Sequence, residues 1–181
     1  MNHLVEKTTN IQAIYQGRII DLQIEDVLLP NGETSKREVV KHPGAVGIIP
    51  ITSEGKLVMV RQYRKALEKV IVEIPAGKLD HQEEPIACAK RELQEETGYV
   101  SNSMDFVVSF YTSPGFANEI IHIYVAGGLE KKEMALDEDE FLDVIEVSIE
   151  EAEEMIQNQI IHDAKTIYAV QYMQLKLAKK E

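Results

Sequence analysis

Short runs of alternating apolar and polar residues fill the first quarter of the chain. They extend over Ile11–His42, and the turn sequence PNG separates Asp21–Leu29 from Ser35–Lys41. Alternation with a period of two is typical of half-buried strands, and a glycine-containing turn between two such runs predicts a hairpin. We therefore predict a small antiparallel sheet at the N-terminus.

Longer apolar runs begin after Pro43 and Gly44. The runs AVGIIPI and LVMVRQYR lie on either side of the turn TSEGK, and VIVEIPAG follows them. Further short runs are found at Phe106–Phe110, Ile120–Ala126 and Val144–Val147. Apolar runs bounded by turn residues predict buried strands, so these segments predict a central sheet.

Apolar residues at helical spacing predict three helices. Two of them close the chain, at about Ile149–Gln159 and Asp163–Lys179, with Asp163 as the N-cap of the second. The third is Pro85–Thr97, because proline suits the first helical turn and Gly98 suits the position after the last. Strands and helices in this arrangement predict an α+β fold with helices covering a mixed sheet.

Composition narrows the possible functions. The 181 residues have a formal charge of −12 and a pI near 4.9, which argues against a nucleic-acid-binding surface. Cys88 is the only cysteine, so an intramolecular disulfide is excluded, as expected in the cytoplasm. We find no apolar run long enough for a membrane span. The sequence predicts a cytoplasmic protein that handles neither nucleic acid nor membrane.

The helix at 85–97 concentrates negative charge near its C-terminal end. Glu92, Glu95 and Glu96 occupy an arc of about 100° on a helical wheel. Carboxylates are unfavourable in the last turn of a helix and repel one another, so helix stability does not explain them. A solvated helix face is one alternative. The other is a site for Mg²⁺ or Mn²⁺, with Arg91 holding Glu95 in place.

The wider spacing favours the metal site. The segment Gly77–Tyr99 matches the pattern G-x5-E-x7-R-E-U-x-E-E-x-G-U, where U is a bulky apolar residue. Its specified positions are Gly77, Glu83, Arg91, Glu92, Leu93, Glu95, Glu96 and Gly98. This segment resembles the signature of Nudix hydrolases. The one departure is Tyr99, which stands where an aliphatic residue is usual.

The resemblance implies a fold and a reaction. The fold is an α/β/α sandwich with a mixed sheet, here residues 44–181, preceded by the N-terminal antiparallel sheet, residues 1–43. The reaction is attack of water on a phosphorus of a nucleoside diphosphate linked to another group. By position, Glu92, Glu96 and the carbonyl of Ala76 would bind the metal ion, and Glu95 would be a ligand or its close support.

An acidic loop downstream resembles a second part of the family's site. In ALDEDEFLDVIEV, Phe141 and Leu142 stand where a calcium loop needs a ligand and a glycine, so a calcium loop is excluded. A solvated acidic loop without a bound ion is the second interpretation of this segment. The resemblance implies that Glu138 is the general base and Glu140 a further metal contact, although the acidic neighbours leave the choice of base open.

The segment YTSPGFANE is similar to one found in ADP-ribose pyrophosphatases, although by itself SPGF is only a turn. The resemblance implies that Arg37 and Arg64 bind substrate, with Arg37 reaching over from the partner subunit of a homodimer that exchanges N-terminal strands. Glu73 and Glu119 match positions that touch the ribose end. Arginine can bind phosphate oxygens through two nitrogens at once.

The function that follows from the resemblance is hydrolysis of ADP-ribose to AMP and ribose 5-phosphate. A second alternative keeps the chemistry but takes a GDP-sugar or a dinucleotide as substrate. A third is a non-catalytic domain that senses ADP-ribose. The three carboxylates of the helix argue against the third alternative, because a sensor has no need of a complete metal site.

Overall fold

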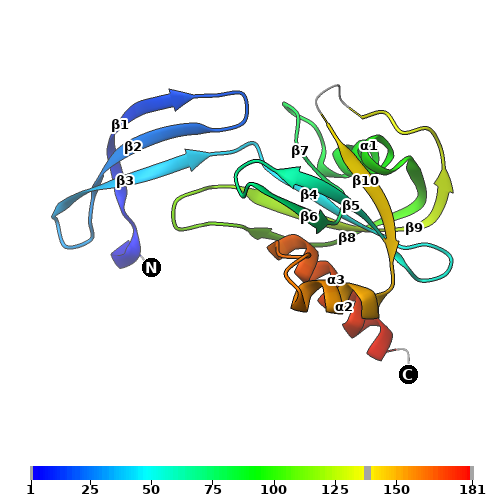
Figure 1. Ribbon diagram of the computed structural model, residues 1–181. Coiled ribbons are helices and arrows are strands. Elements are labelled where there is room, and N and C mark those ends of the chain that lie inside the picture. Colours follow the sequence, from blue (N-terminus) through cyan, green and yellow to red (C-terminus); the bar gives the residue numbers. More distant parts are fainter. Residues whose placement is uncertain (1, 137–139, 180–181) are drawn as a thin grey trace. The chain divides into compact units, whose positions relative to one another are not determined.

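The computed structural model describes residues 2–136 and 140–179, which divide into two compact units (Figure 1). The first unit runs to Gly44 and includes Phe110–Ile121. The second contains Ala45–Ser109 and the chain from His122 onward. No local sequence pattern predicts that Phe110–Ile121 belongs to the first unit. That segment joins β3 (Thr34–Lys41) through backbone hydrogen bonds between residues far apart in the chain.

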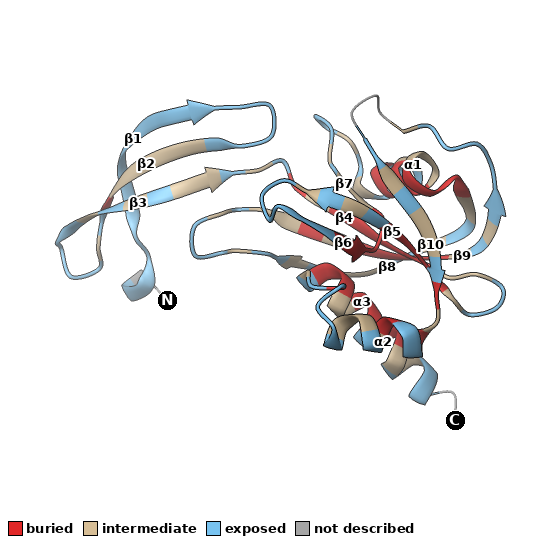
Figure 2. Ribbon diagram, in the orientation of Figure 1, coloured by how far each residue is buried: buried red, intermediate tan, exposed pale blue. Residues whose placement is uncertain are grey.

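The first unit is built on an antiparallel sheet in the order β1-β2-β3. Its elements are η1 (Asn2–Leu4), β1 (Lys7–Gln16), β2 (Asp21–Leu28) and β3 (Thr34–Lys41). The predicted hairpin is confirmed, with Asp21 opposite Lys41 and Leu28 opposite Thr34. Three strands without a covering helix bury little, and Val27 is the buried apolar residue among them (Figure 2).

The second unit contains two sheets, in the orders β10-β5-β6 and β7-β4-β9-β8. Their strands are β4 (Ala45–Pro50), β5 (Leu57–Arg64), β6 (Lys69–Glu73), β7 (Ala76–Lys78), β8 (Tyr99–Tyr111), β9 (Ile120–Lys131) and β10 (Leu142–Val147). The C-terminal end of β8 and the N-terminal end of β9 belong to the first unit. The predicted α+β class with its N-terminal antiparallel sheet is confirmed.

Two strands differ from the prediction. The run VIVEIPAG forms two strands rather than one, because Pro75 lacks an N–H and cannot continue a sheet ladder. Instead its carbonyl accepts a hydrogen bond from the N–H of Ile48, at 2.8 Å. Strand β8 begins at Tyr99 rather than near Phe106, because the polar stretch between them is recruited to the sheet without an alternating apolar pattern.

Three helices flank the strands of the second unit, with α1 (Pro85–Thr97) on one side and α2 (Ile149–Gln157) and α3 (Ala164–Ala178) on the other (Figure 1). This is the predicted α/β/α layering. Asp163 caps α3, as predicted, by accepting a hydrogen bond from the N–H of Thr166. No helix in the described ranges is both long and apolar enough to cross a membrane.

The core on the α1 side of the sheet fixes how this helix is rotated. Cys88, Ala89 and Leu93 are fully buried against strand residues that include Val46, Ile48 and Val58. The same rotation carries two acidic residues inward, since Glu92 and Glu96 are also buried. Charged residues are rarely buried in this way without a partner, so the acidic face of α1 needs a functional explanation.

Candidate metal and diphosphate site

Helix α1 begins and ends where local signals place it. Pro85 occupies the first turn, and Gly98 ends the helix in the left-handed conformation, with φ of 67°. The N–H of Gly98 donates to the carbonyl of Gln94 at 2.9 Å. A Cβ at Gly98 would lie 2.9 Å from the carbonyl of Lys132, so both the conformation and the close approach require glycine. The predicted bounds of this helix are confirmed.

Arg91 joins the helix to the loop before it. Its guanidinium donates to Glu83 at 2.9 and 3.0 Å, to Glu92 at 2.7 Å and to Glu95 at 2.9 Å. The predicted contact with Glu95 is therefore present, together with two more. Hydrogen bonds from Arg91 lower the pKa of Glu83 to about 2, so this carboxylate stays ionised. Arg91 holds three carboxylates in fixed positions.

Glu92 and Glu96 lie against the backbone of β7. The N–H of Ala76 donates to the carboxylate of Glu96 at 2.9 Å. A Cβ at Gly77 would lie 1.9 Å from the carboxylate carbon of Glu92, so any side chain there would displace that carboxylate. The structure thus brings Ala76, the predicted backbone ligand, next to both predicted carboxylate ligands. Gly77 is required because the strand and the carboxylate approach so closely.

The buried carboxylates are electrostatically unfavourable as they stand. The pKa of Glu96 is raised to about 8, chiefly by burial and also by the neighbouring charges of Glu92 and Glu140. The hydrogen bond from Ala76 and the charge of Arg64 act in the opposite direction. Burial is also the main cause of the raised pKa of Glu92. A divalent cation beside these carboxylates would favour their ionised forms, so the donor set suits the oxygen-preferring Mg²⁺.

The side chains alone do not complete a cation cage. Within residues 2–136 and 140–179, no group of three or more His, Cys, Asp or Glu side chains is gathered closely enough to hold an ion. Mg²⁺ usually binds proteins through one or two carboxylates and completes its coordination with waters and substrate phosphates. Two buried carboxylates beside the backbone of Ala76 fit this mode of Mg²⁺ binding better than that of a closed structural site.

The acidic loop before β10 is only partly described. Glu138, the predicted base, lies outside the described residues, as do its two neighbours. Glu140 is described and exposed, and its charge raises the pKa of both Glu92 and Glu96. The predicted metal contact at Glu140 therefore belongs to the same electrostatic environment as the helix carboxylates.

Arg64 and Glu73, both predicted to bind substrate, form an ion pair with 2.6 Å between Nε and a carboxylate oxygen. Glu73 is buried and also accepts from Lys165 at 2.5 Å, so both of its oxygens are occupied. Sequence reasoning missed Lys165. A lone lysine near the start of an amphipathic helix carries no signal for a partner 92 residues away.

The other two predicted substrate residues lie in the first unit. Arg37 pairs with Glu6 at 2.6 Å and lines a hollow of about 370 Å³ beside Phe116. Glu119 accepts from the hydroxyl of Thr112 at 2.5 Å, and its carboxylate lies 3.7 Å from Nδ1 of His42. Arg37 and Phe116 together offer a guanidinium and an aromatic ring, and both groups stack on planar bases.

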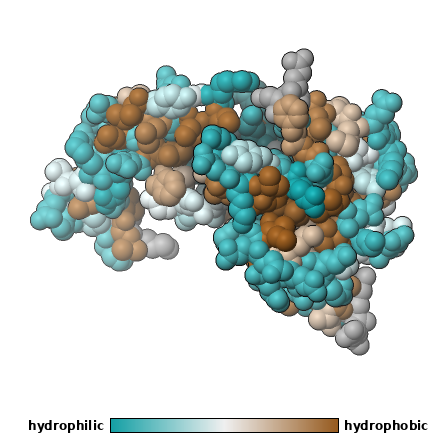
Figure 3. All heavy atoms as spheres, in the orientation of Figure 1, coloured by the Kyte–Doolittle hydropathy of each residue, from teal (hydrophilic) through white to brown (hydrophobic). Residues whose placement is uncertain are grey.

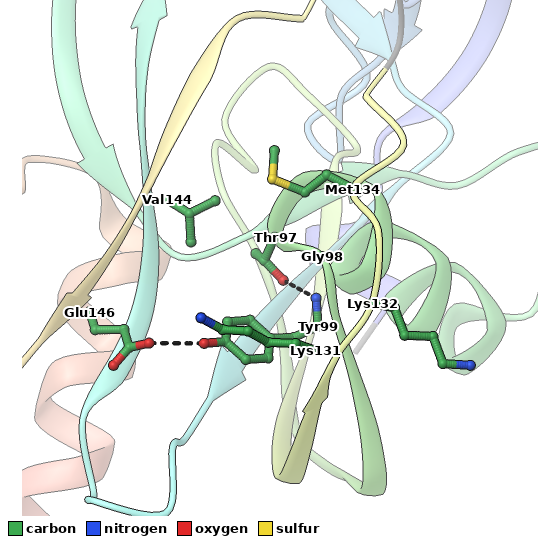
Figure 4. Close-up of a pocket in the computed structure, with 8 residues that line it drawn as sticks. All are labelled: Thr97, Gly98, Tyr99, Lys131, Lys132, Met134, Val144 and Glu146. Atoms are coloured by element: carbon green, nitrogen blue, oxygen red, sulfur yellow. Dashed lines mark hydrogen bonds between the residues drawn. The ribbon is translucent and has the colours of Figure 1, made fainter.

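The one departure from the signature has a structural explanation. The hydroxyl of Tyr99 donates to Glu146 on β10 at 2.9 Å, and the amine of Lys131 lies over its ring, 5.6 Å from the centroid. These residues line a pocket of about 340 Å³ at the C-terminal end of α1 (Figure 4). The side chain of Lys132 points away from Tyr99, so the two lysines do not converge on one ligand (Figure 4). Tyr99 connects the end of α1 to β10.

Comparison with known proteins places this geometry in a family. The NUDIX domain matches residues 41–169. An ADP-ribose pyrophosphatase of Bacillus subtilis (strain 168) is 54% identical over 182 residues, covering 98% of this chain and 97% of that protein. A methanol dehydrogenase activator of Bacillus methanolicus is 60% identical over 177 residues, covering 97% and 96%.

A solved structure agrees with the fold. The crystal structure of an ADP compounds hydrolase aligns with a TM-score of 0.83 at 22% identity, covering 97% of this chain and 95% of that chain. The match extends through both units rather than through the signature segment alone. The signature is matched at every position except Tyr99, and its buried carboxylates lie against β7. Together with relatives that align along nearly the whole chain, this shows that the protein belongs to the NUDIX domain family.

Proposed function

We propose that this protein hydrolyses the diphosphate bond of ADP-ribose to AMP and ribose 5-phosphate, with Mg²⁺ or Mn²⁺ as cofactor. The observation that carries the choice of substrate is the 54% identity to an ADP-ribose pyrophosphatase over nearly the whole of both chains. Nudix hydrolases in general depend on divalent metal ions. The buried carboxylates of α1 supply a site of the required chemistry.

In this proposal Glu92, Glu96 and the carbonyl of Ala76 hold the cation, with Glu140 as a further contact. The bound ion would supply Lewis acidity toward a phosphoryl oxygen and lower the pKa of water. Arg91 keeps Glu92 and Glu95 in place through the hydrogen bonds described above. We expect Glu92→Gln to lower kcat severely, because it removes a charged ligand without changing the size of the side chain.

We assign the general base to the loop before β10. Glu138 is the proposed base, and it would accept the proton of the attacking water as the bond between phosphorus and the bridging oxygen breaks. Glu138→Gln tests the choice, with Glu154→Gln, at an exposed position of α2, as the matched control. An unchanged pH–rate profile and rate in Glu138→Gln would move the role to a neighbouring residue of the loop.

Substrate contacts are proposed at Arg64 and Arg37. Arg64 carries positive charge close enough to Glu96 to lower its pKa, so it suits the diphosphate beside the metal. Arg37 and Phe116 line the hollow of the first unit, which suits the base. Glu73 and Glu119 remain predicted contacts at the ribose end. Both accept hydrogen bonds from neighbouring side chains, which hold their carboxylates in place.

We further propose a homodimer formed through the N-terminal sheet. Strand β1 is exposed along its whole length, including Ile11, Ile14 and Tyr15. Figure 3 shows apolar residues, in brown, on the surface of the first unit. An exposed edge strand with apolar side chains favours pairing with another chain. If Arg37 acts in the partner's site, mixing Arg37→Ala with Glu92→Gln should restore activity that neither variant has alone. Mixing without any recovery would place Arg37 in the site of its own chain.

The function is tested with a substrate panel in Mg²⁺ and in Mn²⁺. ADP-ribose, GDP-mannose, NADH, diadenosine polyphosphates and nucleoside triphosphates are compared for kcat/KM, with Glu92→Gln as the inactive control. We expect ADP-ribose to give the highest value and to release AMP. A clear preference for another compound would overturn the choice of substrate while leaving the metal site in place.

A second candidate function is activation of a methanol dehydrogenase. It is favoured by the 60% identity to a methanol dehydrogenase activator over nearly the whole chain. The test adds the protein, with Mg²⁺, to a bacillar methanol dehydrogenase and measures the rate of methanol oxidation. Stimulation by the wild type and none by Glu92→Gln would tie activation to the carboxylates of α1.

A further inference from the structure

A chain of four charged side chains connects three elements of the second unit. Arg64 ends β5 and donates from Nε to Glu73, which ends β6, at 2.6 Å. The other oxygen of Glu73 accepts from Nζ of Lys165, in the first turn of α3, at 2.5 Å. Nζ of Lys165 also contacts Asp163, the N-cap of α3, at 3.0 Å. Two positive and two negative groups therefore balance one another along this chain.

Arg64 is the exposed end of this chain. Its side chain is 40% exposed, whereas the side chains of Glu73 and Lys165 are 3% and 10% exposed. The contact with Glu73 uses Nε alone, and within the described residues no hydrogen bond joins either terminal nitrogen to the protein. An arginine fixed through Nε presents its two terminal nitrogens as a fork, which is the geometry that matches phosphate oxygens.

The contact with Lys165 accounts for the fact that Glu73 accepts a hydrogen bond from Nε of Arg64 alone. A buried carboxylate needs its charge balanced and both oxygens hydrogen-bonded. With Lys165 on one oxygen, one nitrogen of Arg64 satisfies the other. Without Lys165, the free oxygen of Glu73 would attract a terminal nitrogen of Arg64, and the resulting two-point ion pair would turn the fork away from solvent.

We propose that Lys165 is a positioning residue for substrate binding. By occupying one oxygen of Glu73, it keeps Arg64 in a one-point contact and leaves the fork free for the substrate diphosphate. This inference rests on the proposed diphosphate hydrolysis. It assigns a role in the site to the C-terminal helix, whose side chains lie outside the Nudix signature.

The test is a double-mutant cycle between Lys165→Met and Arg64→Ala, measured as kcat and KM for ADP-ribose with Mg²⁺. Lys165→Met should raise KM about tenfold and change kcat less than about twofold, because the contact serves ground state and transition state alike. In the Arg64→Ala background the same substitution should have almost no effect on KM. Lys165→Arg should recover most of the wild-type KM.

Two controls separate positioning from folding. Lys69→Met removes a lysine of β6 that contacts the carbonyl of Gln159 and not Glu73, and it should leave both constants unchanged. Thermal unfolding shows whether each variant is folded at the assay temperature. Where Lys165→Met is not folded, Lys165→Gln replaces it, since its amide is neutral and still able to donate to Glu73, with a smaller rise in KM expected.

The proposal is overturned if Lys165→Met lowers kcat with KM unchanged, or if its effect is the same with and without Arg64. Failure of the proposed function is a different result, in which the wild type does not hydrolyse ADP-ribose. In that case the same cycle is measured by calorimetric binding of inorganic pyrophosphate with Mg²⁺. Weaker binding in Lys165→Met that disappears in the Arg64→Ala background would still support the positioning role, and equal binding would refute it.

Discussion

The substitution Glu96→Gln tests whether the site destabilises the protein when no metal ion is bound. Glu96 is 3% exposed and accepts a hydrogen bond from the N–H of Ala76. Its pKa is raised from 4.5 to about 8, first of all by burial. Glutamine has nearly the same shape and keeps an oxygen for Ala76, but it carries no charge. The substitution therefore removes the ionisation and little else.

The sign of the effect follows from where the proton is bound. Between pH 4.5 and 8 the folded protein keeps a proton on Glu96 that the unfolded chain releases, so the free energy of unfolding falls as the pH rises through this window. The full cost is present above pH 8. A pKa raised from 4.5 to about 8 corresponds, at about 1.4 kcal/mol per pH unit, to about 5 kcal/mol. This value is an upper limit, because side-chain relaxation and water reduce it.

The assay is urea unfolding between pH 5 and pH 9, in EDTA and in Mg²⁺. In EDTA, Glu96→Gln should be more stable than the wild type by several kcal/mol at pH 9, and the difference should shrink toward zero as the pH approaches 4.5. Mg²⁺ should stabilise the wild type and have little effect on the variant, because binding to the folded state alone raises the free energy of unfolding. Glu154→Gln, at an exposed position of α2, is the control and should follow the wild type.

Two results would refute this reasoning. One is a wild-type stability in EDTA that does not fall between pH 5 and pH 9, since the carboxylate of Glu96 would then carry no burial cost. The other is equal stabilisation of the wild type and Glu96→Gln by Mg²⁺, since the ion would then bind somewhere else.

Three further substitutions test single contacts. Gly77→Ala should lower kcat more than tenfold and cost about 1–3 kcal/mol in unfolding experiments, because the added Cβ would lie 1.9 Å from the carboxylate carbon of Glu92; unchanged kinetics would contradict this close approach. Tyr99→Phe removes the 2.9 Å hydrogen bond to Glu146 and should cost about 1 kcal/mol in urea unfolding while kcat stays the same. Ser148→Ala removes the capping box of α2 and should lower the free energy of unfolding by about 1 kcal/mol, measured in the same way, with no change in KM.

The sequence by itself determined the elements that depend on local interactions. The bounds of α1 follow from Pro85 at its start and Gly98 after its end, and the cap at Asp163 follows from the preference of that position for a short polar side chain. Alternating residues and the PNG turn were sufficient for the β2–β3 hairpin. The helical wheel of residues 85–97 identified the acidic face of α1, because a helix places residues four positions apart on one side.

Only the tertiary structure decided which distant groups meet. Packing of Leu93 against the sheet buried Glu92 and Glu96 and so raised the pKa of both carboxyl groups. The position of β7 brought Ala76 to Glu96, which is twenty positions away in the sequence. The contact between Lys165 and Glu73 spans 92 positions and has no local pattern. Periodicity and capping depend on residues within one or two helical turns of each other, so a local pattern predicts them. Burial and ion pairing depend on how whole elements pack together, so no local pattern in the sequence predicts which residues will be buried or paired.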